Sequence, residues 1–195
     1  FRPIALSTVG NYKTPDRPAW PRPEIVPLRE PGDYAPKPAT ASQPPLRTYE
    51  ESAVGEGERG AAVGTEAGLS SVLVTAETAA PGLDGKPSRH SLKFTDAAGL
   101  PYSFVPYVTY PLVQEAGTLR MAFDLRWEKG ALLALDWRDD PYKYNMGPNL
   151  LTTADGWLSA NGKQMLQLPE GKWVHVEIVC GLGPRANGKY DLTIK

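Results

Sequence analysis

The chain has 195 residues, a formal net charge of −1 and a single cysteine, Cys180. A nearly neutral charge offers no cationic surface for phosphate backbones, so we expect no nucleic-acid partner. One cysteine excludes an internal disulfide and a cysteine-built zinc site. The longest apolar runs are too short to cross a bilayer, so we expect no membrane partner either.

Residues 1–45 form a leader that is rich in proline. About half of the 20 prolines in the chain lie before Leu46. Proline cannot donate to a strand ladder and disrupts a helix, so the leader is predicted to be an extended arm that cannot build a core of its own. Its apolar side chains, among them Trp20 and Ile25, are too numerous for a solvated tether. We therefore expect residues 1–45 to pack on a preceding domain of the same protein.

Residues 46–195 show the alternation of apolar and polar residues that is typical of β-strands. A loop rich in Gly, Ala and Glu at residues 51–68 is followed by alternating segments at 69–75 and 90–96. In residues 118–128 every second side chain is large and apolar, from Leu119 to Trp127. This pattern predicts a long strand with one buried face.

The second half of the chain continues in the same way. The apolar run at residues 130–137 indicates a strand that is covered on both faces. Asn161 and Gly162 predict a two-residue type I′ turn between two strands. Residues 173–180 alternate again, and residues 189–194 form the last predicted strand. No stretch of a dozen residues has a convincing helical period, so the sequence predicts an all-β fold, an antiparallel two-sheet sandwich that follows the extended arm.

Short sequence patterns carry a resemblance to known families. The sequence YEESAVG at residues 49–55, with HSLKF at residues 90–94, resembles the opening of jelly-roll carbohydrate-binding modules. The sequence GKWVHVEI at residues 171–178 is similar to the concanavalin-like (laminin-G-like) sandwiches of bacterial polysaccharide-degrading proteins. In the leader, FRPIALSTVG at residues 1–10 followed by PAW at residues 18–20 resembles the segment that ends right-handed parallel β-helix domains. The resemblance implies a concanavalin-like or jelly-roll sandwich that follows a β-helix domain.

This resemblance also implies a function. The chain would be an accessory domain that binds a polysaccharide or oligosaccharide, in a secreted bacterial protein that is extracellular or periplasmic. The parent protein would be a glycoside hydrolase or a polysaccharide lyase, and this chain by itself would not be catalytic. Two alternatives stay open: the chain contributes residues to a substrate cleft, or it is a purely structural cap on the β-helix. Complete concanavalin-like domains have closing strands beyond the position of Lys195, so we expect the sandwich to be truncated there.

A structural calcium ion is a further implication of the resemblance, because jelly-roll binding modules commonly hold one near the first strand. Acidic and carbonyl oxygens are the ligands that calcium prefers. By resemblance, the candidate ligands are Glu50, Glu51 and Asp96.

A group of aromatic residues is the strongest candidate for a sugar site. A flat ring can stack on the apolar face of a pyranose while neighbouring polar side chains bond the hydroxyls. The alternative is that these rings pack on the neighbouring domain. Trp127 and Trp173 are expected in the core of the sandwich instead. The predicted sugar-binding residues are Trp137, Arg138, Asp139, Tyr142, Tyr144 and Trp157.

No complete catalytic signature is present in the sequence. Asp136, Asp139 and Asp140 lie close together, but Asp-Asp followed by proline is typical of a turn, in which Asp accepts bonds from backbone amides. His175 is predicted to share a strand face with Glu177, and the two could transfer protons if that face lined a groove. A histidine in such a place is more often a surface residue bonded to a neighbour.

Overall fold

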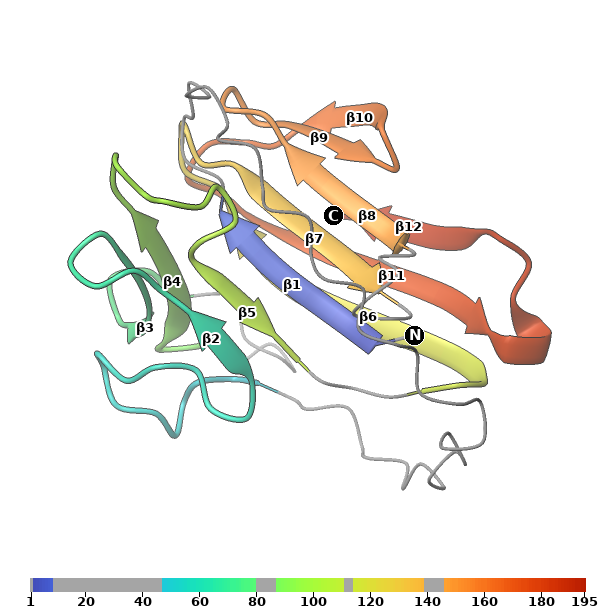
Figure 1. Cartoon of the computed structure of the whole chain (residues 1–195), viewed down its shortest axis with the longest axis horizontal. Coiled ribbons are helices and arrows are strands. Elements are labelled where there is room, and N and C mark those ends of the chain that lie inside the picture. Colours follow the sequence, from blue (N-terminus) through green and yellow to red (C-terminus); the bar gives the residue numbers. More distant parts are fainter. Residues whose placement is uncertain (1, 9–46, 80–86, 111–113, 139–145) are drawn as a thin grey trace, which may run out of the picture.

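The computed structural model describes residues 2–8, 47–79, 87–110, 114–138 and 146–195 (Figure 1). These residues form strands and one turn of 3-10 helix, η3, and the described part of the chain has no α-helix. The predicted all-β class is therefore confirmed. The elements are β1 (Arg2–Thr8), β2 (Ala62–Gly64), β3 (Ser70–Thr75), β4 (Ser91–Asp96), β5 (Tyr107–Thr109), β6 (Gly117–Arg126), β7 (Leu133–Arg138), β8 (Met146–Thr152), β9 (Trp157–Ala160), β10 (Lys163–Gln167), β11 (Trp173–Leu182), η3 (Gly183–Arg185) and β12 (Tyr190–Ile194).

The strands form three antiparallel sheets. The largest has seven strands in the order β10-β9-β8-β7-β1-β5-β2, and a second sheet has the order β12-β11-β6. The hairpin of β3 and β4 forms a two-stranded sheet, which lies on the left in Figure 1. Several antiparallel sheets are thus present, as the alternating sequence predicted.

The three-stranded sheet has one apolar face because apolar and polar residues alternate along its strands. Ile178 of β11 lies at the centre of this face and pairs across the strands with Met121 of β6 and Leu192 of β12. The long strand predicted at residues 118–128 is β6, and its apolar residues meet those of β11 in register. The buried residues of β11 are Val174, Val176, Ile178, Cys180 and Leu182.

The seven-stranded and three-stranded sheets share one core. Leu135 and Trp137 of β7 and Leu150 of β8 belong to the same buried cluster as Val176 and Ile178 of β11. Burial of this apolar surface is the main stabilising contribution to such an arrangement. The strand predicted from the apolar run at residues 130–137 is β7, which lies between β8 and β1 in the larger sheet. Figure 1 shows β6 and β11 running behind β1 and β7, so the two sheets form two layers.

The turn between β9 and β10 has the predicted geometry. Asn161 and Gly162 have φ values of 45° and 78°, and both values lie in the left-handed region that a type I′ turn requires. The Asn161 side chain adds to this turn, because its Oδ1 accepts a bond of 3.0 Å from the backbone N–H of Asn149 on β8. The turn therefore joins β9 to β10 and also contacts the next strand of the sheet.

The first residues of the leader contribute a central strand, β1, to the larger sheet. β1 pairs with β7 on one side and with β5 on the other, so it completes the sheet of the sandwich. Pro3 pairs with Trp137 of β7 and precedes the part of β1 that pairs with β5, which is where a strand tolerates a missing N–H. No other proline occurs before Pro15, so the first residues can form a ladder. Residues 9–45 of the predicted arm lie outside the described residues.

Deletion of residues 1–8 tests the place of β1 in the sheet. We expect a clear loss of stability, because the deletion removes the strand between β5 and β7 and leaves each of them with one paired neighbour in place of two. If each ladder hydrogen bond contributes about 1 kcal/mol, the melting temperature should fall by roughly 10 °C or more. Thermal unfolding followed by circular dichroism measures this change. An unchanged melting temperature would show that the segment is an appendage and not a strand of the sheet.

Candidate functional site

The predicted sugar-binding residues that the structure describes, Trp137, Arg138 and Trp157, do not form one exposed site. Trp137 is fully buried on the inner face of β7, and its indole N–H donates to Met121 Sδ at 3.4 Å. The alternation of β7 places Trp137 on the same face as Leu135, so Trp137 is a core residue with no face open to a sugar. Trp157 is partly buried at the start of β9, opposite Gln167 of β10.

The remaining members of the predicted set are partly outside the described structure. Arg138 pairs with its near neighbour Asp136, with 2.7 Å between Nη2 and Oδ2. Asp139, Tyr142 and Tyr144 lie outside the described residues. Their role in sugar binding stays a prediction.

Glu50, the first predicted calcium ligand, is fully engaged by another segment of the chain. Its Oε1 accepts bonds from Ser88 Oγ at 2.6 Å, from the N–H of Arg89 at 2.8 Å and from the N–H of His90 at 3.2 Å. Its Oε2 accepts a bond from Arg89 Nε at 3.0 Å. The Ser88 hydroxyl and the Arg89 donors together lower the pKa of Glu50 to about 2. Glu50 thus anchors the start of the sandwich to the segment before β4.

Glu51 and Asp96 are the other two predicted calcium ligands. Neither is a hydrogen-bond partner of Glu50. Glu51 lines a pocket described below, whereas Asp96 ends β4 opposite Ser70. Burial raises the pKa of Asp96. Within the described ranges, no three His, Cys, Asp or Glu residues are grouped so that they could hold a metal ion. Calcium binding stays a prediction.

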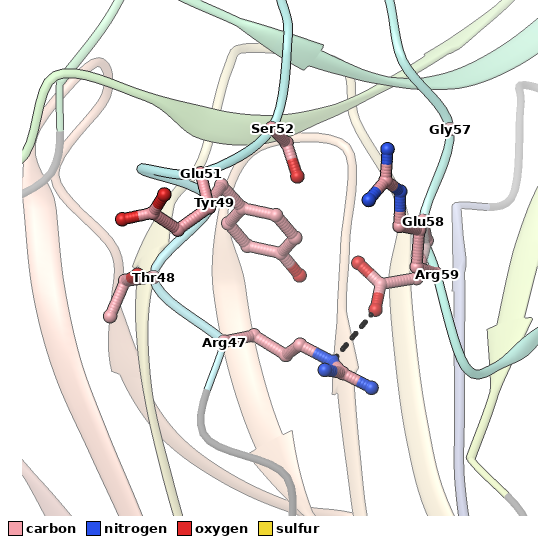
Figure 2. Close-up of a pocket in the computed structure, with 8 residues that line it drawn as sticks. All are labelled: Arg47, Thr48, Tyr49, Glu51, Ser52, Gly57, Glu58 and Arg59. Atoms are coloured by element: carbon pink, nitrogen blue, oxygen red, sulfur yellow. Dashed lines mark ion pairs between the residues drawn. The ribbon is translucent and has the colours of Figure 1, made fainter.

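A cavity of about 230 Å³ lies where the sandwich begins, between the turn at Tyr49 and the segment at Glu58 (Figure 2). Arg47 Nε is 3.1 Å from Glu58 Oε1, and the Glu58 side chain is only 1% exposed. Figure 2 shows the Tyr49 ring lying between Ser52 on one side and Arg47 and Glu58 on the other. The lining residues are Arg47, Thr48, Tyr49, Glu51, Ser52, Gly57, Glu58 and Arg59.

The backbone at Tyr49 is held in an unusual conformation. Its φ is +61°, in the left-handed region that residues other than glycine rarely adopt. The Tyr49 carbonyl accepts bonds from the backbone N–H of Ser52 at 3.1 Å and from His90 Nδ1 at 3.0 Å. These bonds, with those of the neighbouring Glu50, fix the turn that carries the aromatic ring. Non-glycine residues with such φ values are concentrated at sites that bind or react.

Burial dominates the electrostatics of this cavity. It raises the pKa of Tyr49 far above the ordinary range, with a smaller contribution from Tyr110, and it raises the pKa of Tyr110 to about 12. Both hydroxyls therefore stay protonated at neutral pH. Both oxygens of Glu58 are shielded from solvent, and no described residue gives them a well-aligned hydrogen bond. The Arg47 guanidinium supplies the main neutralising charge for this carboxylate.

A pair of exposed aromatic rings lies in the loop between β4 and β5. Tyr102 and Phe104 are 49% and 51% exposed, and their ring centroids are 5.2 Å apart with 23° between the ring planes. Tyr107 continues the group, with its centroid 6.1 Å from that of Phe104. A Cβ at Gly64 would lie 2.1 Å from the Tyr107 ring, so only glycine allows β2 to approach it. We call Tyr102 and Phe104 the aromatic pair.

The aromatic pair is not among the predicted site residues, although the sequence carries a signal for it. Residues 101–107 read PYSFVPY, with rings at alternate positions between two prolines. Such a segment resembles a short apolar strand, and its exposure depends on how the loop leaves the sheet. The sequence pattern by itself does not distinguish an exposed ring from a buried one.

The outer face of the three-stranded sheet carries charged side chains. His175 Nδ1 is 2.8 Å from Asp124 Oδ1, its cross-strand neighbour on β6. Arg120 Nη2 donates to Glu177 Oε2 at 2.5 Å on the same sheet. Trp173, expected in the core, is instead partly buried, and the alternation of β11 puts it on the face of His175. Trp127 is buried, as predicted.

Comparison with protein-family models, curated proteins and solved structures finds no match for this chain. In the ranges described, no helix has the length and apolar character needed to span a membrane.

The pKa of Glu50 leads to a prediction about the dependence of stability on pH. A depressed pKa means that the carboxylate stabilises the folded state above its ordinary pKa of 4.5, and that this contribution is lost as the pH falls toward 2. Glu50→Gln should lower the melting temperature at neutral pH. It should also reduce the drop in melting temperature between pH 4.5 and pH 2. Glu170→Gln, at an exposed position between β10 and β11, is the control. If the melting temperatures of Glu50→Gln and of the native protein were equal at every pH, the anchoring role of Glu50 would be contradicted.

Proposed function

We propose that this chain is a concanavalin-like or jelly-roll β-sandwich that binds carbohydrate, as an accessory domain of a secreted bacterial polysaccharide-degrading protein. The observation that carries the proposal is the exposed aromatic pair Tyr102 and Phe104. The two-layered antiparallel architecture supports the fold part of the proposal.

Exposure of aromatic rings to water is unfavourable. Two adjacent rings that are each about half exposed keep apolar surface in water, which is unfavourable unless a ligand covers it. The C–H face of a pyranose is flat and weakly apolar, and its equatorial hydroxyls remain in water when that face stacks on a ring. A polysaccharide can therefore cover the aromatic pair without losing much hydration. The stacking of Phe104 on Tyr102 restricts both rings, which reduces the entropy lost on binding.

Contribution to a substrate cleft is a second candidate function, and the His175–Asp124 pair favours it. A carboxylate at 2.8 Å orients the imidazole as in an acid–base pair. This candidate requires release of reducing or unsaturated chain ends, which His175→Asn would abolish. The accessory-domain proposal instead expects no new chain ends when the protein is mixed with polysaccharides.

Affinity electrophoresis in gels that contain plant and algal polysaccharides tests the carbohydrate-binding proposal. We expect retardation by at least one polysaccharide, and a loss of affinity of about three- to tenfold for Tyr102→Ala and for Phe104→Ala. Met165→Ala removes another exposed apolar side chain, on β10, and should leave the retardation unchanged.

Two outcomes would contradict the proposal. Absence of retardation in every gel, with the variants still folded, would favour the structural cap. Equal retardation of the native protein and both aromatic variants would place the sugar elsewhere on the domain.

A further inference from the structure

We propose that the cavity between Tyr49 and Glu58 is a second carbohydrate contact, which holds one uncharged sugar ring at the end of a glycan chain. This inference rests on the proposed function and names the class of sugar. It concerns a site distinct from the aromatic pair, because none of the residues lining the cavity belongs to that pair.

The size of the cavity limits what it can hold. Its volume of about 230 Å³ is below the range of roughly 300–1,000 Å³ that is usual for drug-sized ligands. One sugar ring fits such a space, whereas a run of several rings does not. A chain would therefore enter by its terminal unit.

The charges around the cavity give no net attraction to a charged ligand. Two guanidinium groups, of Arg47 and Arg59, and two carboxylates, of Glu51 and Glu58, belong to its lining. Glu58 is shielded from solvent and Arg59 is paired with Glu56, so the two groups left to meet a ligand are the Glu51 carboxylate and the Arg47 guanidinium, whose charges balance. A neutral polyhydroxylated ring suits such a lining, because its hydroxyls can donate to the Glu51 oxygens and accept from guanidinium N–H groups.

Arg47 is the main donor that the cavity offers. Its Nε faces Glu58, and its side chain lines the cavity and is 37% exposed. A Cβ at Gly60 would lie 2.6 Å from Arg47 Nη2, so a glycine there gives the guanidinium room against the backbone. Figure 2 shows the Arg47 guanidinium, the Glu58 carboxylate and the Tyr49 hydroxyl directed toward one another.

Glu58 acts as a positioning residue in this site. Its carboxylate is shielded from solvent and holds the Arg47 guanidinium in one orientation. The protonated hydroxyls of Tyr49 and Tyr110 lie close enough to Glu58 to share its electrostatic environment. A donor that is already fixed loses less entropy when a ligand arrives. The Tyr49 ring, held by its left-handed backbone, adds a flat surface beside this donor.

Titration of the ¹⁵N-labelled chain with free monosaccharides, followed by amide chemical shifts, tests the inference. The probes are glucose and galactose, with glucuronate and galacturonate as their charged counterparts. We expect at least one neutral sugar to shift the amides of residues 47–60, with a Kd on the order of 1 mM. The matching uronate should bind at least about tenfold more weakly.

Variants of the ion pair complete the test. Arg47→Gln should weaken binding of the neutral sugar by about tenfold or more, and Arg185→Gln, at an exposed position in η3, is the matched control. Because Arg47→Gln leaves the buried Glu58 charge unpaired, the double variant Arg47→Gln/Glu58→Gln keeps the test valid if the single variant unfolds. Unperturbed amides elsewhere in the spectrum show that each variant is folded.

The outcomes separate this inference from the proposed function. Equal affinity for the uronate, shifts confined to other residues, or full affinity in the folded Arg47 variants would overturn the inference. The absence of any shift with all four sugars would overturn it as well. In each case, the proposed function would still be supported if a polysaccharide retarded the native protein and the Tyr102 and Phe104 variants lost this retardation. Absence of retardation in every gel would instead overturn the function itself.

Discussion

The packing of β11 against β7 is the contact on which the rest of the structure depends. Val176 and Ile178 on one layer and Leu135 and Trp137 on the other are all fully buried. Each layer has polar residues on its outer face, so neither can bury its apolar face without the other. The loops that carry the candidate sites extend from these two layers. Their conformation therefore depends on the stability of the core between the layers.

Both candidate sites are connected to the frame through β5. The aromatic pair precedes this strand, and Tyr110, which shares the environment of Tyr49 and Glu58, follows it directly. β5 is in turn paired with β1 and β2. A three-residue strand spans only about 10 Å, so a change that disturbs β5 would affect both sites. The leader strand β1 therefore bears on function although it belongs to neither site.

Local patterns in the sequence predicted the parts of the fold that depend on neighbours along the chain. The alternation in residues 173–180 identified the buried face of β11, and Asn161-Gly162 identified the turn between β9 and β10. β1 was not predicted, because the prolines of residues 15–45 determined the interpretation of the whole leader, although residues 4–8 contain none. The site was harder to predict, because ring exposure and the ion pair of Arg47 with Glu58 depend on which segments meet in space.

The sequence by itself determined the all-β class, the direction in which each long strand turns its apolar side chains, and the tight turn at Asn161. These features follow from steric preferences and from the two-residue period of a strand, which act over a few residues. Only the tertiary structure decided that β1 lies between β5 and β7, that Trp137 is buried while Tyr102 and Phe104 are exposed, and that Glu50 anchors a distant segment. Each of these depends on contacts between residues far apart in the chain, and an aromatic or acidic residue has the same local pattern whether its partner is solvent, a ligand or the core.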